Sequence, residues 1–142
     1  MAEIEMLIDS IRVSAVNDQR VVILKEKIAD RFLPIWIGPV EADVIAIKLQ
    51  NVPVTRPLTH DFVCDVINAL GATIKSVVVC ELKEETFLAK VVLESKGKGL
   101  EIDCRPSDAL AVAVRVNAPI FADEKVLEIA GVLKNEEGKE QT

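Results

Sequence analysis

The feature that most constrains the fold is a run of three apolar, β-branched segments separated by very short polar connections. The segments cover residues 74–82, 87–95 and 100–104, and the connections are residues 83–86 and 96–99. Connections this short join antiparallel neighbours, because a parallel pair needs a crossover of a dozen or more residues. The sequence therefore predicts an antiparallel, three-stranded meander.

The N-terminal part of the chain predicts a second group of strands. Residues 4–16, which alternate well in their second half, and the apolar run 21–24 flank a polar turn, so we expect a hairpin. Another strand is expected at residues 33–37. Pro34 has no N–H to donate, which places that strand at an edge or at a bulge. A short strand is expected at residues 120–122.

Four segments have helical patterns: residues 40–49, 59–70, 108–116 and a short piece at 124–129. We expect Thr59 and Ser107 to cap the second and third helices and Gly71 to end the second. The first and third are apolar nearly all round and should be well buried. The prediction is an α+β fold with a mixed, largely antiparallel sheet and three to four helices.

The totals predict one domain in a reducing compartment. With 142 residues, half of them hydrophobic, the chain can bury a core, so we expect one domain at residues 1–133 and a polar, disordered tail at 134–142. The three cysteines are odd in number and form no C-x-x-C pair, which favours buried free thiols and a cytoplasmic location. Neither a signal peptide nor a membrane span is indicated.

Charge and hydropathy bear on partners. The net charge of −6 argues against tight, non-specific binding of nucleic acid, but it leaves room for a local positive groove. The positive mean hydropathy of +0.30 suggests apolar surface buried between subunits, and a homodimer is the commonest assembly of that kind.

The segment 103–108, Asp-Cys-Arg-Pro-Ser-Asp, runs from the end of a strand to the start of a helix. A tight turn there brings Asp103 and Asp108 near each other with Arg105 between them. Two carboxylates can hold a divalent cation, and a helix N-terminus can receive a phosphate. The residues alone favour the simpler alternative, a salt bridge of Arg105 with ordinary helix capping.

The segment 56–61, Arg-Pro-Leu-Thr-His-Asp, holds the only histidine of the chain. His60 is a natural general base, and Asp61 is a carboxylate that could orient it. Adjacent helical residues point in different directions, however, so a capping turn with a locally paired Arg56 explains the segment equally well. Glu41 and Asp43 in the first turn of the first helix need no ligand, because carboxylates suit the positive end of the helix dipole.

Taken together, these motifs resemble the bifunctional nuclease domain family over roughly residues 5–130. The resemblance rests on the order and spacing of several short segments: Leu33-Pro34-Ile35-Trp36-Ile37-Gly38, Glu41-Ala42 with Ile45-Ala46, Arg56 to Asp61, Leu70-Gly71-Ala72, Asp103 to Ala111 and Pro119-Ile120.

The resemblance implies a wedge-shaped α+β subunit that forms a homodimer, with a groove that cleaves DNA and RNA. By position, the implied catalytic residues are His60, Asp61, Asp103, Arg105 and Asp108. Arg56 and Ser107 are the implied substrate-binding residues. In this hypothesis His60 activates water, and the arginines stabilise the charge that develops on phosphorus.

The residues also allow for a metal ion and for functions other than a nuclease. Glu41, Asp103 and Asp108 are candidate ligands for Mg²⁺ or Mn²⁺, an inference from the number of carboxylates alone. The main alternative to a nuclease is a non-catalytic ligand-binding or scaffolding homodimer, which the acidic charge and the scarcity of aromatic residues favour. A small-molecule hydrolase acting on a phosphate ester is a third possibility.

Overall fold

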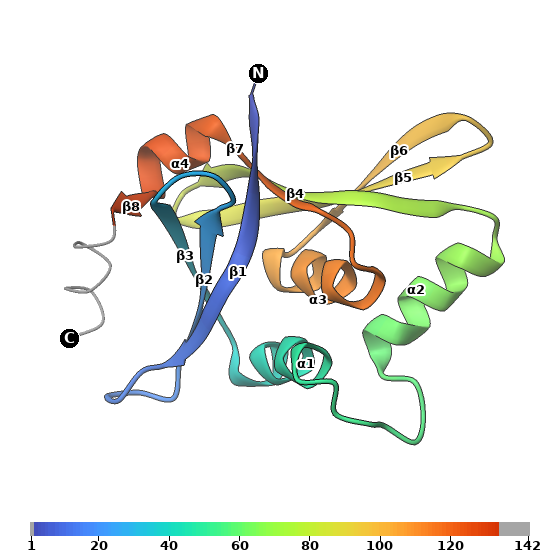
Figure 1. Cartoon of the computed structure of the whole chain (residues 1–142), viewed down its shortest axis with the longest axis horizontal. Coiled ribbons are helices and arrows are strands. Elements are labelled where there is room, and N and C mark those ends of the chain that lie inside the picture. Colours follow the sequence, from blue (N-terminus) through green and yellow to red (C-terminus); the bar gives the residue numbers. More distant parts are fainter. Residues whose placement is uncertain (1, 134–142) are drawn as a thin grey trace.

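The computed structural model describes residues 2–133, so the tail expected at 134–142 lies outside the described residues. The described part is an α+β fold (Figure 1). Its elements in chain order are β1 (Glu3–Val13), β2 (Arg20–Glu26), β3 (Arg31–Ile37), α1 (Pro39–Leu49), α2 (Thr59–Ala69), β4 (Thr73–Lys83), β5 (Thr86–Ser95), β6 (Lys98–Cys104), α3 (Pro106–Val116), β7 (Ile120–Asp123), α4 (Glu124–Ala130) and β8 (Val132–Leu133).

One mixed sheet contains all the strands of the described chain, in the order β6-β5-β4-β7-β1-β2-β3-β8. Both predicted antiparallel groups are confirmed: β4, β5 and β6 form the meander, and β1 and β2 form the hairpin. The short strand β7 joins the two groups, since it pairs parallel to β4 and antiparallel to β1. In Figure 1, β1 to β3 run steeply across the direction of β4 and β5.

The expectation for Pro34 is confirmed in a specific way. The two residues of β8 pair only with Arg31 and Phe32 of β3. Beyond Phe32, the described chain offers β3 a partner strand on the β2 side alone, so Pro34 lies where β3 forms an edge of the sheet, a position at which proline is tolerated.

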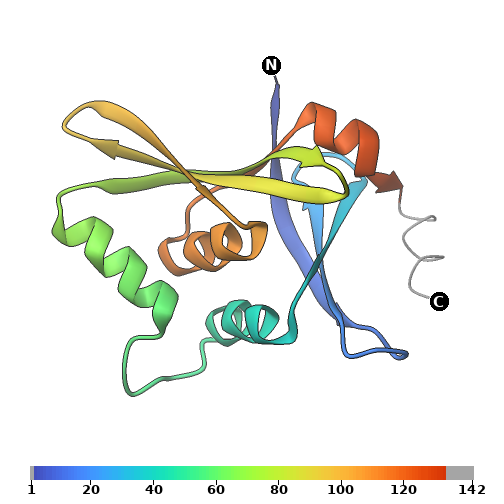
Figure 2. The same cartoon turned by 180° about the vertical axis from the view of Figure 1, so that it is seen from behind.

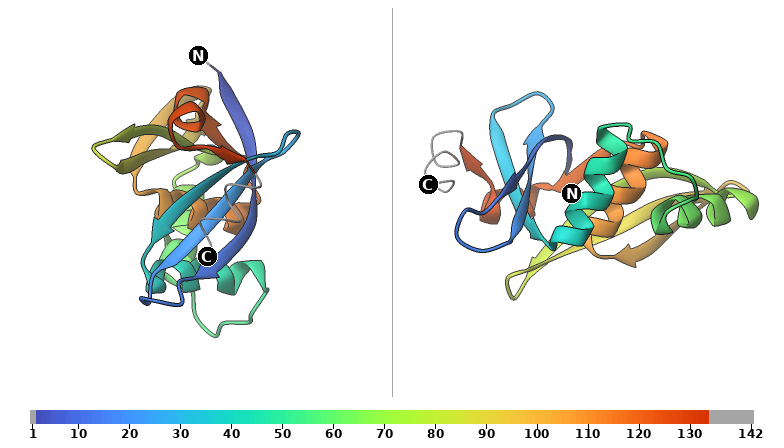
Figure 3. Two further views of the ribbon diagram at one scale, coloured as in Figure 1. Left: turned by 90° about the vertical axis from the view of Figure 1, so that its left-hand side faces the viewer. Right: turned by 90° about the horizontal axis from the view of Figure 1, so that it is seen from below.

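The helix α3 occupies the centre of the core. Its residues Ala109 to Ala113 are all buried, and α1, α2, β4 and β5 surround it. The right-hand view in Figure 3 shows α1, α3 and α2 following one another in front of β4 and β5. The helix α4 packs on β3, β4 and β7 at the end of the molecule away from α2, as Figure 2 shows from behind. The helices α1 and α2 therefore both pack on α3, and the first turns of these three helices supply the polar residues of the candidate site.

The helix boundaries depart from expectation in two places. Thr59 and Ser107 do not cap their helices: both lie inside them, and the N-cap residues are Leu58 and Arg105. Pro106 takes the first helical position, where its missing N–H has no intrahelical partner to lose. Gly71 does follow the end of α2, with the positive φ of 86° that a helix stop of this type uses.

The helix α1 is less buried than its apolar sequence suggested. Only Ala42 and Ile45 are fully buried, and Val40 is largely exposed. The predicted free thiols are confirmed, since Cys64, Cys80 and Cys104 form no disulfide, but all three are half-buried and not fully buried as expected. Within residues 2–133, none of the helices combines the length and the apolar composition that crossing a membrane would require.

Candidate functional site

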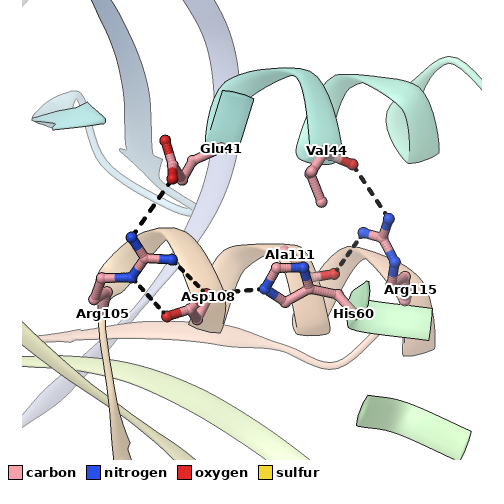
Figure 4. A network of polar contacts seen from close by, with 7 residues as sticks. All are labelled: Glu41, Val44, His60, Arg105, Asp108, Ala111 and Arg115. Carbon is pink, nitrogen blue, oxygen red and sulfur yellow. Dashed lines mark hydrogen bonds and ion pairs between the residues drawn. The ribbon is translucent and has the colours of Figure 1, made fainter. Parts of the chain in front are cut away.

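A connected set of polar side chains joins the first turns of three helices (Figure 4). Arg105, at the N-cap of α3, donates two hydrogen bonds to Asp108, from Nε to Oδ2 at 2.9 Å and from Nη2 to Oδ1 at 3.1 Å. Asp108 Oδ1 also accepts a hydrogen bond from His60 Nε2 on α2, at 2.9 Å. Glu41 Oε2 on α1 lies 3.5 Å from Arg105 Nη1. These four residues form what we call the Arg105 cluster.

Arg105 is both oriented and accessible. The paired bonds to Asp108 fix the plane of the guanidinium, as forked arginine–carboxylate pairs do. These bonds hold the pKa of the Asp108 carboxyl below its usual value, with a smaller contribution from His60, although partial burial opposes the shift. The Arg105 side chain nevertheless remains 64% exposed. A cation held in place and open to solvent can receive a phosphate group.

His60 acts as a link between α2 and α3. Because a carboxylate only accepts hydrogen bonds, His60 Nε2 carries the proton in its contact with Asp108. The other ring nitrogen, Nδ1, is buried and has no hydrogen-bond partner within the described chain. A water molecule therefore has no access to the Nδ1 lone pair in this arrangement, which bears on any role of His60 as a base.

Glu41 reaches Arg105 because residue 38 is a glycine. A Cβ atom built on Gly38 would overlap the Glu41 carboxylate. Gly38 is also the N-cap of α1, and its φ of −73° is one that any residue adopts. The glycine is therefore needed for the close approach of the carboxylate and not for its backbone conformation.

Asp61 belongs to a second network, which supports the helices. Its Oδ2 accepts the Leu58 backbone N–H at 2.9 Å, and its Oδ1 accepts Arg115 Nε at 2.8 Å. The hydrogen bond from the Leu58 N–H has the largest effect and lowers the pKa of the Asp61 carboxyl. Burial opposes this shift, and the charge of Arg115 adds to it. Asp61 thus completes the N-terminal turn of α2, and its carboxylate pairs with Leu58 and Arg115 and not with the His60 ring.

Arg115 is the residue that the sequence analysis missed. Its side chain is only 4% exposed, and besides Asp61 it donates to the carbonyl oxygens of Ala111 and Val44. It therefore ties α1, α2 and α3 together, and Figure 4 shows its contacts with Val44 of α1 and Ala111 of α3. The available signal was a lone arginine in an otherwise apolar helix, because a charge in such a position must find partners when it is buried.

The remaining sequence candidates lie at different distances from this cluster. Asp103 is not part of it: Ile102 and Cys104 line a cavity beside the cluster, so Asp103, which lies between them in β6, points to the other face of the sheet. The expected approach of Asp103 to Asp108 around Arg105 is therefore not found. Ser107 is buried in α3, and Arg56 lies exposed in the loop before α2.

The proposed metal ligands do not converge. Within residues 2–133, no three His, Cys, Asp or Glu side chains come together as a metal cage would require. Glu41 and Asp108 both face Arg105, whose positive charge disfavours a cation between them. Asp103 points away, so Glu41, Asp103 and Asp108 do not fit a shared Mg²⁺ or Mn²⁺ site.

Two cavities meet at the Arg105 cluster, and Glu41 and Arg105 line both. The larger, which we call the α2 cavity, has a volume of about 680 Å³ and also borders His60 and Asp108. Its apolar lining includes Val40, Val63, Ile67, Leu93, Ile102 and Val112. The smaller, the β3 cavity, has a volume of about 430 Å³ and is lined by the end of β3, the β4–β5 turn and the start of α3.

Cys104 also borders the α2 cavity, but its chemistry is not that of a nucleophile. Burial, with help from the charges of Asp108 and Asp103, raises the pKa of the Cys104 thiol to about 11. A thiol with such a pKa stays protonated at neutral pH, and the thiolate is the reactive form. The accessible chemistry of the site is therefore that of one oriented arginine and its carboxylates.

The sequence is similar to those of several known proteins. The sequence matches the bifunctional nuclease domain over residues 22–135. An uncharacterized protein of Mycobacterium tuberculosis is 42% identical over 137 residues, which make up 96% of this chain and 82% of that protein. Bifunctional nuclease 1 of Arabidopsis thaliana is 28% identical over 113 residues, 78% of this chain and 35% of the plant protein.

A third relative extends the comparison to another plant. Bifunctional nuclease 2 of Oryza sativa subsp. japonica is 28% identical over 95 residues, 65% of this chain and 29% of that protein. This chain thus spans about a third of each of these two plant relatives. The domain match covers most of the residues described above, and by it the chain belongs to the bifunctional nuclease domain family.

Proposed function

We propose that this protein is a phosphodiesterase that hydrolyses DNA and RNA, with Arg105 as the residue that binds the scissile phosphate. The observation that carries the proposal is the state of Arg105: two bonds to Asp108 fix its guanidinium, yet most of the side chain stays open to solvent where two cavities meet. Membership of the bifunctional nuclease domain family supports the choice of substrate.

In the proposed reaction, a water oxygen attacks phosphorus and the bond to the leaving oxygen breaks. Arg105 donates hydrogen bonds to the non-bridging oxygens, on which negative charge accumulates in the transition state. Glu41, which lines both cavities, accepts the proton of the attacking water, and the leaving oxygen takes a proton from solvent. Arg56, exposed in the loop before α2, is a candidate contact for a flanking phosphate.

His60 and Asp108 have positioning roles in this proposal. The earlier hypothesis that His60 activates water requires an accessible lone pair, whereas Nδ1 is buried and Nε2–H faces Asp108. We therefore assign water activation to Glu41. His60 holds Asp108, and Asp108 holds Arg105 in the orientation that the phosphate needs.

The experiment is incubation of the purified protein with supercoiled plasmid and with single-stranded RNA, in Mg²⁺, in Mn²⁺ and in EDTA. Wild-type cleavage that falls strongly in Glu41→Gln and in His60→Ala supports the proposal. Cleavage that survives unchanged in both variants indicates a contaminating nuclease and contradicts it. Because Arg105 occupies the position between the two converging carboxylates, we expect the protein alone to bind Mn²⁺ only weakly in a calorimetric titration.

We also propose that two copies associate through the α2 surface, which comprises the outward side chains of α2 and β6. The helix α2 contains no fully buried residue, although its apolar side chains share one face. Phe62 is 63% exposed and Leu70 is 78% exposed, and Leu100 and Ile102 of β6 add to the apolar area. Figures 1 and 2 show α2 and the β5–β6 hairpin tip at the same end of the molecule.

A second copy is the occupant that this surface favours. The same chain offers both an apolar ridge on α2 and an apolar cavity beside it, which is the self-complementary arrangement that a two-fold interface requires. Phe62→Glu should convert a dimer into a monomer in light scattering. Ile28→Glu, at a 92% exposed position in the β2–β3 turn, is the matched control and should not. A wild-type monomer contradicts this proposal and leaves the nuclease proposal standing.

A non-catalytic binding protein is the second candidate function. The observation that favours it is the α2 cavity, whose lining is mostly apolar and therefore suits an apolar ligand or partner better than a nucleic acid. A wild-type protein that cleaves neither plasmid nor RNA under any of the three metal conditions would favour this candidate.

A further inference from the structure

The β3 cavity adjoins the α2 cavity at Arg105. Trp36, Phe87 and Ser107 line it, and Glu41 and Arg105 are shared with the α2 cavity. A phosphate bound by Arg105 would therefore have a second compartment directly beside it. The proposed reaction uses only the two shared residues, Glu41 and Arg105, and gives no role to the aromatic lining.

Trp36 is the most unusual residue of that lining. It is the only tryptophan of the chain, and 57% of its surface is exposed, although its neighbour in β3, Ile35, is 1% exposed. Tryptophan is enriched at binding surfaces, because its large ring offers both apolar contact area and an N–H donor. Phe87, half-buried at the start of β5, adds a second aromatic side chain to the same cavity.

The polar lining is of a specific kind. Ser107, a buried residue that is 6% exposed, borders the cavity and brings a hydroxyl group to it. Glu85, exposed in the β4–β5 turn, and Glu41 contribute carboxylates, which accept hydrogen bonds and never donate them when ionised. Exocyclic amino groups of bases and the ribose hydroxyls are donors that such acceptors match.

We infer that the β3 cavity is a nucleobase subsite, in which the base next to the bound phosphate stacks on Trp36. An aromatic platform beside a cation is the arrangement by which proteins bind single-stranded nucleic acid without strict sequence preference. The inference rests on the proposed function, because that proposal places the phosphate at Arg105. It also explains how a chain with net charge −6 and few aromatic residues can hold a nucleic acid, because the few contacts it needs are gathered at one place.

The composition provides a direct probe, because Trp36 is the only tryptophan and the chain has no tyrosine. Adenosine monophosphate and ribose 5-phosphate are titrated into the wild-type protein in EDTA, with excitation at the red edge of the tryptophan band. Neither compound contains an internucleotide bond, so binding is measured without cleavage. We expect saturable quenching by adenosine monophosphate and much less by ribose 5-phosphate. Equal quenching by both, or none, would overturn the inference.

Variants locate the effect by calorimetry, which does not depend on the fluorescent reporter. Trp36→Ala should weaken binding of adenosine monophosphate about tenfold or more, and Trp36→Phe should restore most of it. Val63→Ala, which trims the α2 cavity only, is the matched control and should bind as the wild type does. Unchanged binding in Trp36→Ala, including the case in which only its oligomeric state changes, would overturn the inference.

The two proposals fail separately in these experiments. Nucleotide binding that depends on Trp36, in a protein that cleaves nothing, would leave the subsite standing and remove the nuclease proposal. Cleavage at wild-type rates by Trp36→Ala, with unchanged nucleotide binding, would remove the subsite and leave the nuclease proposal standing.

Discussion

His60 Nε2 lies 2.9 Å from Asp108 Oδ1, and this contact joins two residues that are 48 positions apart in the chain. It brings the first turn of α2 against the first turn of α3, beside Arg105 (Figure 4). The candidate site therefore depends on helix packing as much as on the residues themselves.

His60→Ala should lower the catalytic efficiency of RNA cleavage about tenfold, because a hydrogen bond to a charged group contributes about 1.5–3 kcal/mol. His60→Gln keeps an N–H donor for Asp108 and should recover much of that loss, with a pH–rate profile of wild-type shape. Equal losses in both variants, with a changed pH profile, would instead identify His60 as the general base.

Asp108→Asn should reduce cleavage more than Asp103→Asn does. Asp108 holds the guanidinium of Arg105 through two hydrogen bonds, whereas Asp103 points to the other face of the sheet. Initial rates on one single-stranded RNA, measured at equal protein concentration, make the comparison. A larger loss in Asp103→Asn would show that the two carboxylates have been assigned in the wrong order.

Gly38→Ala should reduce cleavage several-fold. It should change the free energy of unfolding by less than about 1 kcal/mol, because alanine is a poor N-cap residue but adopts this backbone conformation without strain. The new Cβ displaces the Glu41 carboxylate from Arg105. Gly99→Ala is the matched control, because a Cβ there meets nothing within 4 Å. If the two alanine variants cleave RNA at the same rate, the contact between Glu41 and Arg105 has no catalytic role.

Asp61→Asn should lower the free energy of unfolding at pH 7 by roughly 3 kcal/mol, because it leaves the buried Arg115 without a charged partner. The folded-state pKa of Asp61 lies below its ordinary value of 3.8, so its contribution to stability is present above that pH and is lost as the pH falls further. Urea unfolding between about pH 2 and 7 should thus show a flatter acid limb in the variant.

Asp65→Asn is the control for that experiment, since Asp65 is an exposed carboxylate one turn further along α2. It should leave both the stability at pH 7 and the acid limb close to those of the wild type. An Asp61→Asn protein that is as stable as Asp65→Asn would remove the structural role assigned to Asp61.

The strand groups could be predicted because they depend on local sequence. The β4–β5 turn and the β5–β6 turn each join strands that are neighbours in the chain, so apolar runs and turn residues were enough to identify them. The position of β7 could not be predicted in this way. Between β4 and β7 the chain passes through β5, β6 and α3, and β7 then pairs parallel to β4. No local sequence pattern indicates with which strand β7 will pair.

The site was predicted only in part for the same reason. His60, Arg105 and Asp108 were identified as candidates, but the residues alone could not show that α2 and α3 bring them together. Asp103 was included because it is close in sequence to Arg105, although strand alternation directs its side chain away. Arg115 was missed because its partners on α1 and α2 are fixed only once the three helices pack.

The central claim, that Arg105 binds the scissile phosphate, is tested most directly by single-turnover cleavage of a single-stranded RNA by Arg105→Ala. Lys125→Ala removes the same charge from the exposed surface of α4 and serves as the control. We predict a rate at least about 100-fold below wild type for Arg105→Ala, as for other losses of a group that stabilises transition-state charge, and a near-wild-type rate for Lys125→Ala. Equal rates for the two variants would contradict the claim.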